Sequence, residues 1–354
     1  MKKGRVELRL QRKVDDKVQC LACPRKCIIP EGFKGLCKSK INVDGKIYEV
    51  NYGFVSSVAL DPIEKKPFFN FWPGSWAYSI GTVGCNLKCE HCQNWQISQA
   101  DPEKFSWLIP LSPEDAVKQA KELEARSIAY TYNEPTIVSI EWVLDTAKLA
   151  KQEGILNLSV TNGYWSEESF DLLKNYIDAA NVDVKAFTDR FYRDVAKAPS
   201  IKPVLETVER LKDEKKHVEL TYLIIPTLND SEEEIRAFSK WVFDKLGPDT
   251  PVHFSRYYPA YRMKIHSTPV ATIRRARDIA VEEGLRYVYS GNVPGDPGEN
   301  TYCPSCKKPV IIRYGFDIEE CNLTEDNRCK FCGEKIAIEG RCSSGRKRWP
   351  SLVI

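Results

Sequence analysis

Three cysteines stand close together in the run TVGCNLKCEHCQNW, namely Cys85, Cys89 and Cys92. Three thiolates on one loop can hold three corners of a cubic iron–sulfur cluster, whereas an all-cysteine cluster site usually supplies four. The iron without a thiolate is then open to a small molecule. The alternatives for this spacing are part of a structural zinc site or buried thiols that bind nothing.

A second group of cysteines lies near the start of the chain, in CLACPRKCIIPEGFKGLC. Its members are Cys20, Cys23, Cys27 and Cys37. Four thiols in a short segment with little apolar content suit a tetrahedral site. Such a segment is hard to fold without the binding energy of a metal. Zinc and a second iron–sulfur cluster are both candidates, and free thiols are the alternative.

A third group forms two C-x2-C pairs near the end of the chain. Its members are Cys303, Cys306, Cys329 and Cys332. Two such pairs separated by a hairpin-like stretch are typical of a zinc ribbon, although the spacer here is longer than usual. Cys321 and Cys342 fall outside the paired pattern, so we expect them to be spare thiols rather than ligands.

The elements that must position the central group alternate regularly between about residues 77 and 290. The strand-like runs cover residues 77–83, 127–132, 155–160, 179–184, 217–225 and 251–258. Amphipathic helical stretches separate most of them, and Ser112 is the expected N-cap of the first. Six alternations predict an α/β fold with a parallel sheet curled into a barrel or part of one. An open doubly wound sheet is the alternative, but no dinucleotide glycine fingerprint opens any helix.

Three units follow from these patterns. We expect a cysteine-rich N-terminal metal-binding and β unit over residues 1–76, the barrel over 77–295 and the ribbon-like module over 296–354. The aromatic run PFFNFWPGSWAY near residue 70 is expected to pack the N-terminal unit on the barrel, or else to line a substrate pocket.

Polar residues follow almost every predicted strand. In parallel barrels the catalytic groups come from the loops at the carboxyl ends of the strands. The residues at these ends include Cys85, Asn133, Glu134, Thr161, Asn162, Asp183, Lys185 and Arg256. Placed around the cysteine loop, they suit a charged ligand rich in hydroxyl groups.

Composition and charge narrow the setting. The net charge of +3 is close to neutral and does not indicate binding to nucleic acid or to an anionic membrane. The charged start MKKGRVELRLQRK is not a signal peptide, and no apolar run approaches membrane-spanning length. Eleven of the 13 cysteines fall in three groups at metal-ligand spacings, so metal binding in a reducing cytoplasm is expected rather than disulfide formation.

Taken together, the motifs resemble those of radical SAM enzymes, in the branch related to pyruvate formate-lyase activating enzymes. The chain most resembles the AmmeMemoRadiSam system radical SAM enzymes. The matching pieces are CLACPRKC, KKPFFNFWPGS, GCNLKCEHCQNW, YNEPT, TNGY, VDVKAF, GNVPG and the terminal ribbon. The resemblance implies a partial (βα)6 radical SAM barrel. It also implies a [4Fe–4S] cluster on Cys85, Cys89 and Cys92 that binds S-adenosylmethionine (SAM), cleaves it reductively to a 5′-deoxyadenosyl radical and so abstracts hydrogen from an unidentified substrate.

The same resemblance implies contacts to SAM, residue by residue. His91 stands where the family usually has an aromatic residue beside the adenine. Glu134 would accept from the ammonium group, although the two glycines that precede it in the activating enzymes are absent. Asn162 would bind a ribose hydroxyl, and Lys185 with Asp183 would meet the carboxylate. Asn133, Thr161 and Arg256 complete the expected cofactor contacts.

The cofactors implied are the cluster, SAM, zinc in the C-terminal group, and either zinc or a second iron–sulfur cluster in the N-terminal group. An external low-potential donor such as ferredoxin or flavodoxin is expected, since reductive cleavage needs a cluster at the low end of the range of potentials. The substrate is a small molecule or a protein. Two alternative functions remain: activation of a glycyl radical enzyme, and a non-catalytic metal-bearing scaffold.

Overall fold

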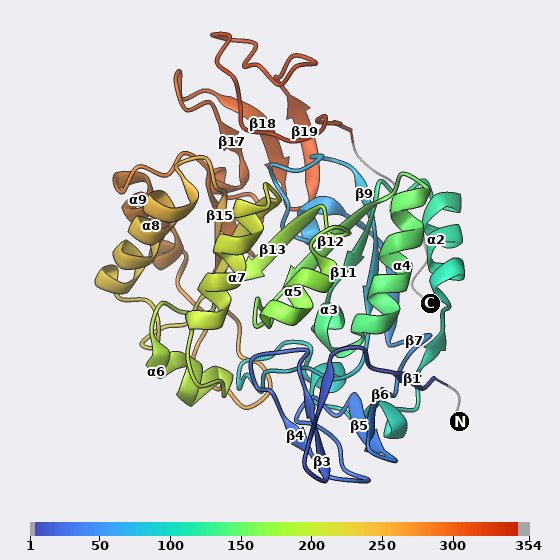
Figure 1. Cartoon of the computed structure of the whole chain (residues 1–354). Coiled ribbons are helices and arrows are strands. Elements are labelled where there is room, and N and C mark those ends of the chain that lie inside the picture. Colours follow the sequence, from blue (N-terminus) through green and yellow to red (C-terminus); the bar gives the residue numbers. More distant parts are fainter. Residues whose placement is uncertain (1–3, 346–354) are drawn as a thin grey trace.

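The computed structural model describes residues 4–345. Its centre is an eight-stranded sheet in the order β16-β15-β14-β13-β12-β11-β9-β8 (Figure 1). All neighbouring pairs are parallel except β8 and β9, which pair antiparallel at one edge. The strands are β8 (Ser57–Pro62), β9 (Trp76–Gly81), β11 (Ser127–Tyr130), β12 (Leu156–Thr161), β13 (Ala179–Asp183), β14 (His217–Ile224), β15 (Val252–Arg256) and β16 (Val288–Gly291).

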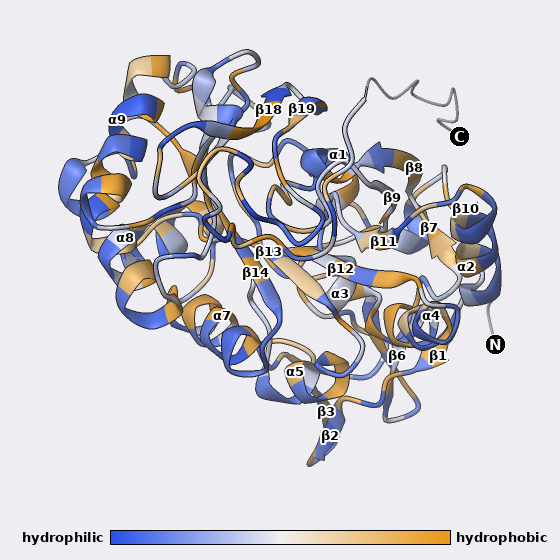
Figure 2. Ribbon diagram, turned by 90° about the horizontal axis from the view of Figure 1, so that it is seen from above, coloured by the Kyte–Doolittle hydropathy of each residue, from blue (hydrophilic) through white to orange (hydrophobic). Residues whose placement is uncertain are grey.

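Helices cover the outer face of this curved sheet. Seen from above, they form an arc around the strands (Figure 2). The longer helices are α2 (Pro113–Glu122), α4 (Ile140–Gln152), α5 (Glu167–Leu173), α7 (Lys202–Asp213), α8 (Glu232–Leu246) and α9 (Val270–Glu282), and the short ones are α1 (Trp95–Ser98), α3 (Pro135–Val138) and α6 (Asp189–Phe191). No helix within residues 4–345 combines the length and the apolar character needed to cross a membrane. The predicted α/β class with a parallel sheet is confirmed.

Local sequence signals explain where several helices begin. Ser112, Ser166 and Ser231 are the N-caps of α2, α5 and α8, and each side chain accepts a hydrogen bond from the backbone N–H three residues later. Such caps satisfy one of the N–H groups that a helix start leaves unpaired. The N-cap role predicted for Ser112 is therefore confirmed. Apolar residues at helical spacing then bury one side of each helix against the sheet.

All six predicted strands are present, and the sheet has two more. β16 adds a seventh parallel strand beside β15, and β8 adds the antiparallel edge. β16 spans only Val288–Gly291, too short for a clear pattern, and the turn-rich sequence GNVPGDPG follows immediately. The pairing of β8 with β9 depends on contacts between segments that the local sequence pattern does not specify.

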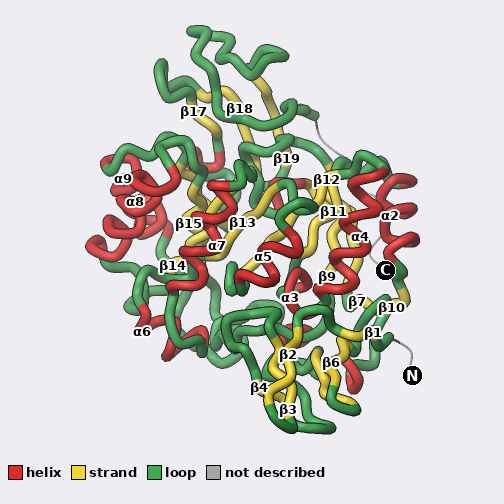
Figure 3. Tube along the Cα trace, in the orientation of Figure 1, coloured by secondary structure: helices red, strands yellow, loops and turns green. Residues whose placement is uncertain are grey.

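Small sheets built from the N-terminal residues cover one end of the barrel, beneath the loop that follows β9 (Figures 1 and 3). Their strands are β1 (Val6–Glu7), β2 (Gln11–Val14), β3 (Lys17–Cys20), β4 (Ile28–Ile29), β5 (Lys40–Val43) and β6 (Lys46–Glu49), with β7 (Phe54–Val55) paired to β10 (Ile109–Pro110). Ser166 Oγ donates to the Leu21 carbonyl at 2.6 Å and so ties this unit to the start of α5.

The C-terminal residues form a three-stranded sheet at the opposite end, with long loops between its strands (Figures 1 and 3). Its strands are β17 (Thr301–Tyr302), β18 (Pro309–Tyr314) and β19 (Asp317–Cys321). This sheet has its own apolar cluster, which includes Val310, Ile311 and Ile336. The barrel therefore carries one cysteine-rich unit at each end.

The aromatic run lies elsewhere than expected. Phe68 and Phe71 pack on Ala129 and Leu158, on strands of the barrel, whereas Phe69 joins the apolar cluster of the C-terminal sheet. The expectation that this run packs the N-terminal unit on the barrel was wrong for these three rings, because they meet barrel strands and the C-terminal sheet. The alternative, that the run lines a pocket, holds for Phe69, which lines the cavity at the strand ends. We call residues 67–72 the inner segment.

A buried carboxylate anchors the inner segment. Glu219 accepts hydrogen bonds from the backbone N–H of Phe69 and Asn70 at 3.0 and 2.8 Å. His217 and His253 lie 2.9 and 2.6 Å from its two oxygens. Burial alone would raise the pKa of Glu219, but the hydrogen bonds and charge of the two imidazoles outweigh burial and lower the pKa to about 2.

Candidate functional site

The loop after β9 carries the three closely spaced cysteines. Cys85 and Cys89 are buried and Cys92 is half-buried, and all three line one cavity of about 520 Å³. The Leu87 backbone N–H donates to Cys85 Sγ at 3.4 Å, and Cys92 Sγ lies 3.2 Å from Ser98 Oγ. These contacts orient two of the three sulfur atoms on the wall of the cavity.

The spacing of these thiols fits a cluster better than a single ion. A tetrahedral zinc ion with bonds of about 2.3 Å brings its thiolates to about 3.8 Å from one another. Within the described residues, these three sulfur atoms do not form a group in which all lie within 4.8 Å of one another. Burial raises the pKa of Cys89 to about 11, so metal binding must displace its proton.

The carboxyl ends of the strands bring most of the predicted residues to this cavity. The predicted site residues that line it are Cys85, Cys89, His91, Cys92, Asn133, Thr161, Asn162, Asp183 and Lys185. They come from the loops or ends of β9, β11, β12 and β13. Neighbouring parallel strands end at the same edge, so residues about 100 positions apart in the chain face one another.

Lys185 and Asp183 form an ion pair at the wall of the cavity. Lys185 Nζ lies 2.9 Å from Asp183 Oδ2. Burial alone would lower the pKa of Lys185, but the negative charge of Asp183 and its hydrogen bond outweigh burial and raise it. The ammonium group is therefore charged at neutral pH and presents a positive charge beside the cysteine loop.

His91 is a buried imidazole on the same wall. Its Nδ1 has no hydrogen-bond partner among the described residues. Burial, followed by the charge of Lys185, lowers the pKa of His91 to about 3, so the ring is neutral. A buried polar atom without a partner is costly. His91 is among the residues that line the cavity, so a molecule bound there would be the nearest partner for this atom.

Asn133 links the loop after β11 to the cysteine loop. Its Oδ1 accepts from the Thr82 backbone N–H at 3.0 Å, and its Nδ2 donates to the Gly84 carbonyl at 2.7 Å. Gly84 has φ of +103°, a conformation that favours glycine. Asn133 thus fixes the backbone from which Cys85 projects.

Glu134 lies beneath the cavity rather than on its wall. The carboxylate accepts from Thr161 Oγ1 at 2.5 Å and from the Asn162 backbone N–H at 2.7 Å. Trp165 Nε1 also donates to it, at 3.4 Å. Burial raises the pKa of Glu134 to about 7, although these hydrogen bonds oppose the rise. In this arrangement Glu134 holds the Thr161–Asn162 loop in place, and both of its oxygens are already engaged.

Arg256 also faces away from the cavity. Its Nε donates to the Thr268 carbonyl at 2.8 Å, and its Nη1 donates to Tyr258 Oη at 3.0 Å. Its neighbour Ser255 lines the cavity instead. Successive residues of a strand point to opposite faces, so one position separates a cavity residue from one turned outward.

Lys66 also lines the cavity and had no predicted role. Lys66 is buried, with its Nζ 2.7 Å from Asp61 Oδ2, and Tyr132 Oη donates to the same oxygen at 2.7 Å. Burial lowers the pKa of Lys66 to about 8, although Asp61 opposes this shift. The KK pair before the aromatic run was the only local signal, because β8 brings Asp61 and β11 brings Tyr132 to Lys66, and both strands pair with β9.

The C-terminal pairs meet in one compact group. The Sγ atoms of Cys303 and Cys332 are 3.6 Å apart, and those of Cys306 and Cys329 are 3.7 Å apart. All four lie within 4.8 Å of one another and could hold a metal ion. Cys321 and Cys342 lie outside this group, and a hydrogen bond from the Cys342 thiol lowers the pKa of Cys321 to about 7.

Comparison with known proteins agrees with this geometry. The family model "Radical SAM superfamily" matches residues 79–239, which include the cysteine loop and the strand ends around the cavity. A protein of Methanocaldococcus jannaschii, MJ0808, described as uncharacterized, is 46% identical over 326 residues, 92% of this chain and 96% of that protein. The chain belongs to the radical SAM superfamily. Membership implies a [4Fe–4S] cluster and SAM, and the three thiols and the cavity fit both.

Other relatives lie in the activating-enzyme branch. The putative glycyl-radical enzyme activating enzyme MJ1227 of M. jannaschii is 29% identical over 179 residues, 49% of this chain and 71% of that protein. The pyruvate formate-lyase-activating enzyme of Clostridium pasteurianum is 26% identical over 161 residues, which are 43% of this chain and 63% of that protein. A radical SAM methyltransferase from Sphaerobacter thermophilus has the same fold, with a TM-score of 0.50 and 14% sequence identity. The match covers 84% of this chain and 81% of the methyltransferase chain.

Proposed function

We propose that this radical SAM protein cleaves SAM reductively and uses the product to abstract hydrogen from a further substrate. The observation that carries the proposal is that Cys85, Cys89 and Cys92 line one cavity together with polar residues from the strand ends. Three thiolates leave one iron of a cubic cluster open to the amino and carboxylate groups of SAM. When bound, the cluster supplies the electron that breaks the sulfonium bond.

The side chains around the cavity bind and orient SAM. Lys185, held charged by Asp183, neutralises the SAM carboxylate. Asn162 binds a ribose hydroxyl, and Thr161 stands beside it on the cavity wall. Glu134 acts on SAM through the backbone of Asn162, which it fixes from below.

Two further residues define the adenine side and the outer wall of the cavity. The neutral ring of His91 lies on the cavity wall with an unpartnered Nδ1, so it can stack beside adenine or accept a hydrogen bond from it. Phe316, at the tip of the β18–β19 hairpin, lines the same cavity. The C-terminal unit thereby helps to exclude water from the reacting atoms.

The remaining components follow from the same chemistry. We propose a zinc ion on the C-terminal cysteines, whose sulfur spacing suits a single tetrahedral ion. A ferredoxin or flavodoxin in the cytoplasm supplies the low-potential electron. The substrate is a small molecule or a protein, and no nucleic-acid or membrane partner is proposed.

Activation of a glycyl radical enzyme is the second candidate function. Its support is the similarity to proteins named as glycyl-radical enzyme activating enzymes and to the C. pasteurianum enzyme. Against it, the hairpin tip of the C-terminal unit and the inner segment both occupy the cavity wall, through Phe316 and Phe69. They reduce the space through which a glycine loop of a large partner would enter.

The test is anaerobic cleavage of SAM. The reconstituted protein, given SAM and dithionite, is expected to form 5′-deoxyadenosine, detected by mass spectrometry. Cys89→Ala is expected to form none, because two thiolates do not retain the cluster. Methylthioadenosine as the product would show that a different sulfonium bond breaks. No product from a protein fully loaded with cluster would support the scaffold alternative.

Deuterium separates the two candidate functions. In heavy water with a candidate substrate, abstraction of its carbon-bound hydrogen gives 5′-deoxyadenosine without deuterium. In ordinary water, a substrate deuterated at that carbon places deuterium in the 5′-deoxyadenosine. A stable glycyl radical signal on an added partner protein, seen by electron paramagnetic resonance (EPR), would favour the activating function. Transfer of deuterium from a small molecule to 5′-deoxyadenosine would show that this small molecule, and not a glycyl residue of a partner protein, is the substrate in that reaction.

A further inference from the structure

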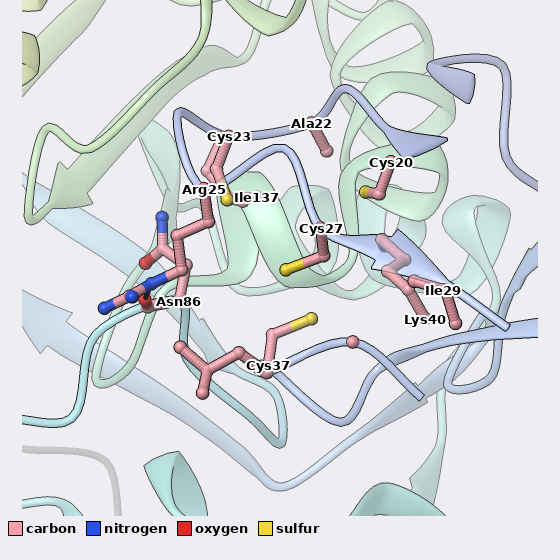
Figure 4. Close-up of a pocket in the computed structure, with 12 residues that line it drawn as sticks. Cys20, Ala22, Cys23, Arg25, Cys27, Ile29, Cys37, Lys40, Asn86 and Ile137 are labelled. Carbon is pink, nitrogen blue, oxygen red and sulfur yellow. Dashed lines mark hydrogen bonds between the residues drawn. The ribbon is translucent and has the colours of Figure 1, made fainter. Parts of the chain in front are cut away.

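The four N-terminal cysteines surround a second, smaller cavity, distinct from the SAM site. It lies between the β2–β4 sheet and the cysteine loop, and its volume is about 20 Å³, against about 520 Å³ for the cavity at the strand ends. The thiol groups of Cys20, Cys23, Cys27 and Cys37 turn toward the same space (Figure 4). Cysteines brought together from four positions in this way form a ligand set rather than scattered free thiols.

The sulfur spacing argues against a single metal ion in this cavity. In the part of the chain that the structure describes, only the C-terminal cysteines form a group of three or more ligand atoms within 4.8 Å of one another. The N-terminal sulfurs are more widely spaced, as are those of Cys85, Cys89 and Cys92. Four thiolates on one zinc ion must approach to about 3.8 Å, whereas thiolates on the corners of a cubic cluster bind four different irons.

The order of the cysteines along the chain agrees with the spacing. Three of them lie close together, at C-x2-C-x3-C, and the fourth follows after nine residues. Three close cysteines with one distant partner is an arrangement used by cluster-binding segments. The C-terminal group instead uses two separate C-x2-C pairs, the arrangement of zinc ribbons.

The walls of the cavity suit an anionic, buried cluster. Ala22, Ile29 and Ile137 form its apolar part, and Arg25 and Lys40 supply positive charge. Lys40 Nζ is buried and lies 2.8 Å from Glu49 Oε2. Apolar surroundings and nearby charges are the features by which proteins set the potential of an iron–sulfur cluster.

The second cavity adjoins the SAM site through the backbone of residues 84–86. Asn86 lines the N-terminal cavity, whereas its neighbour Cys85 lines the SAM cavity. Arg25 Nε donates to the Asn86 carbonyl. A methyl group added at Gly84 would lie 2.5 Å from the Cys37 carbonyl oxygen.

We propose that Cys20, Cys23, Cys27 and Cys37 hold a second [4Fe–4S] cluster, immediately behind the loop of the first. All four irons of this cluster have a thiolate ligand, so it has no open position and does not bind SAM. The proposal concerns the N-terminal site alone and does not depend on whether the protein cleaves SAM.

The test removes the first cluster and leaves the N-terminal unit untouched. The full chain with Cys85→Ala, Cys89→Ala and Cys92→Ala together is purified anaerobically, and its iron, acid-labile sulfide and zinc are measured. We expect half of the wild-type iron and sulfide with unchanged zinc, and a reduced-cluster EPR signal that SAM does not alter. Iron-free protein with the same zinc would overturn the proposal in favour of free thiols.

The reciprocal variant, Cys23→Ser with Cys27→Ser, completes the test. It should also lose half of the iron, while its remaining EPR signal changes when SAM is added. Loss of one zinc per chain with unchanged iron would assign zinc to this site and overturn the proposal. Cys321→Ser is the matched control, since Cys321 belongs to none of the three groups, and it should leave both metals unchanged.

If the reciprocal variant fails to fold, the wild-type protein still decides the question. Its reduced EPR spectrum should contain two cluster signals, of which SAM alters one. A single signal that SAM alters completely would overturn the proposal. Formation of 5′-deoxyadenosine is measured separately, so a failure of the proposed function and a failure of the second cluster give different results.

Discussion

The two ends of the barrel each carry four cysteines, yet their sulfur atoms are arranged differently. At the C-terminal end, opposed pairs lie 3.6 and 3.7 Å apart. At the N-terminal end, the sulfurs surround a cavity and no three of them lie within 4.8 Å of one another. Equal numbers of the same ligand can thus suit one ion or a cluster of irons. The distance between sulfurs is the property that separates the two cases.

The two units also meet the barrel in different ways. The N-terminal unit contacts the cysteine loop, through Arg25 and the Asn86 carbonyl. The C-terminal unit contacts the inner segment, where Asn70 Nδ2 donates to the Ala337 carbonyl at 2.8 Å and the Trp72 N–H donates to the Glu339 carbonyl at 2.7 Å. A change at one end should therefore affect iron, and a change at the other end should affect zinc and the cavity wall.

The largest effect is expected from removing half of the C-terminal ligands. Cys329→Ser with Cys332→Ser should abolish zinc binding completely, because two thiolates cannot complete a tetrahedral site. Iron and sulfide should stay at wild-type levels, since these cysteines lie at the far end of the barrel from the cysteine loop. Metal analysis of the purified full chain is the measurement. An equal fall in iron would mean that the two ends do not bind their metals independently.

Next in size is the effect of removing the anchor of the inner segment. Glu219→Ala leaves two histidines and two backbone N–H groups without their buried carboxylate, and should lower the free energy of unfolding by about 3–5 kcal/mol. Denaturant unfolding monitored by tryptophan fluorescence measures the change. The control is Glu122→Ala, whose exposed pair with Lys118 contributes about 0.5 kcal/mol or less. Equal destabilisation by the two variants would contradict an anchoring role.

A smaller effect is expected where the N-terminal unit meets the cysteine loop. Gly84→Ala combines a φ of +103° with a contact of 2.5 Å to the Cys37 carbonyl oxygen, and should cost about 2–3 kcal/mol. Iron content should fall because the loop and Cys37 must separate. Gly154→Ala, with φ of +72° and no atom within 4 Å of the added methyl, should cost about 1–2 kcal/mol and leave iron unchanged. Unchanged iron in Gly84→Ala would show that this contact does not hold the metal sites.

The smallest effect is expected at the matching contact of the C-terminal unit. A methyl group at Gly74 would lie 1.9 Å from the Ser343 carbonyl oxygen, at a φ of +77°. Ser343 is exposed and can move away, so Gly74→Ala should cost only about 1–2 kcal/mol. Faster proteolysis after residue 340, at unchanged iron, is the expected result. A fall in iron as large as that of Gly84→Ala would erase the difference between the two ends.

Much of the fold could be predicted because its signals are local. Apolar runs of strand length identified six of the parallel strands, and the expected N-cap Ser112 identified the start of α2. β16 was missed because four residues beside a turn carry little pattern. The course of the inner segment was misjudged, because aromatic composition predicts burial but does not say which surface covers the rings.

The candidate site divides in the same way. Residues directly at strand ends, such as Asn162 and Lys185, line the cavity as expected. Glu134 and Arg256 lie next to such positions but point elsewhere, since neighbouring residues face opposite sides of a strand or loop. Lys66 was overlooked because Asp61 and Tyr132, which hold it in place, come from elements that only the sheet brings together.

By itself, the sequence determined which residues can bind metal and in what order the strands and helices follow, because cysteine spacing and apolar periodicity are properties of neighbouring residues. Only the tertiary structure decided how far apart the thiols of each group lie and which strand-end side chains face the cavity. These distances depend on strand register and on packing between segments far apart in the chain. That is why the number of cysteines in a group does not by itself tell how far apart their sulfur atoms lie in the fold.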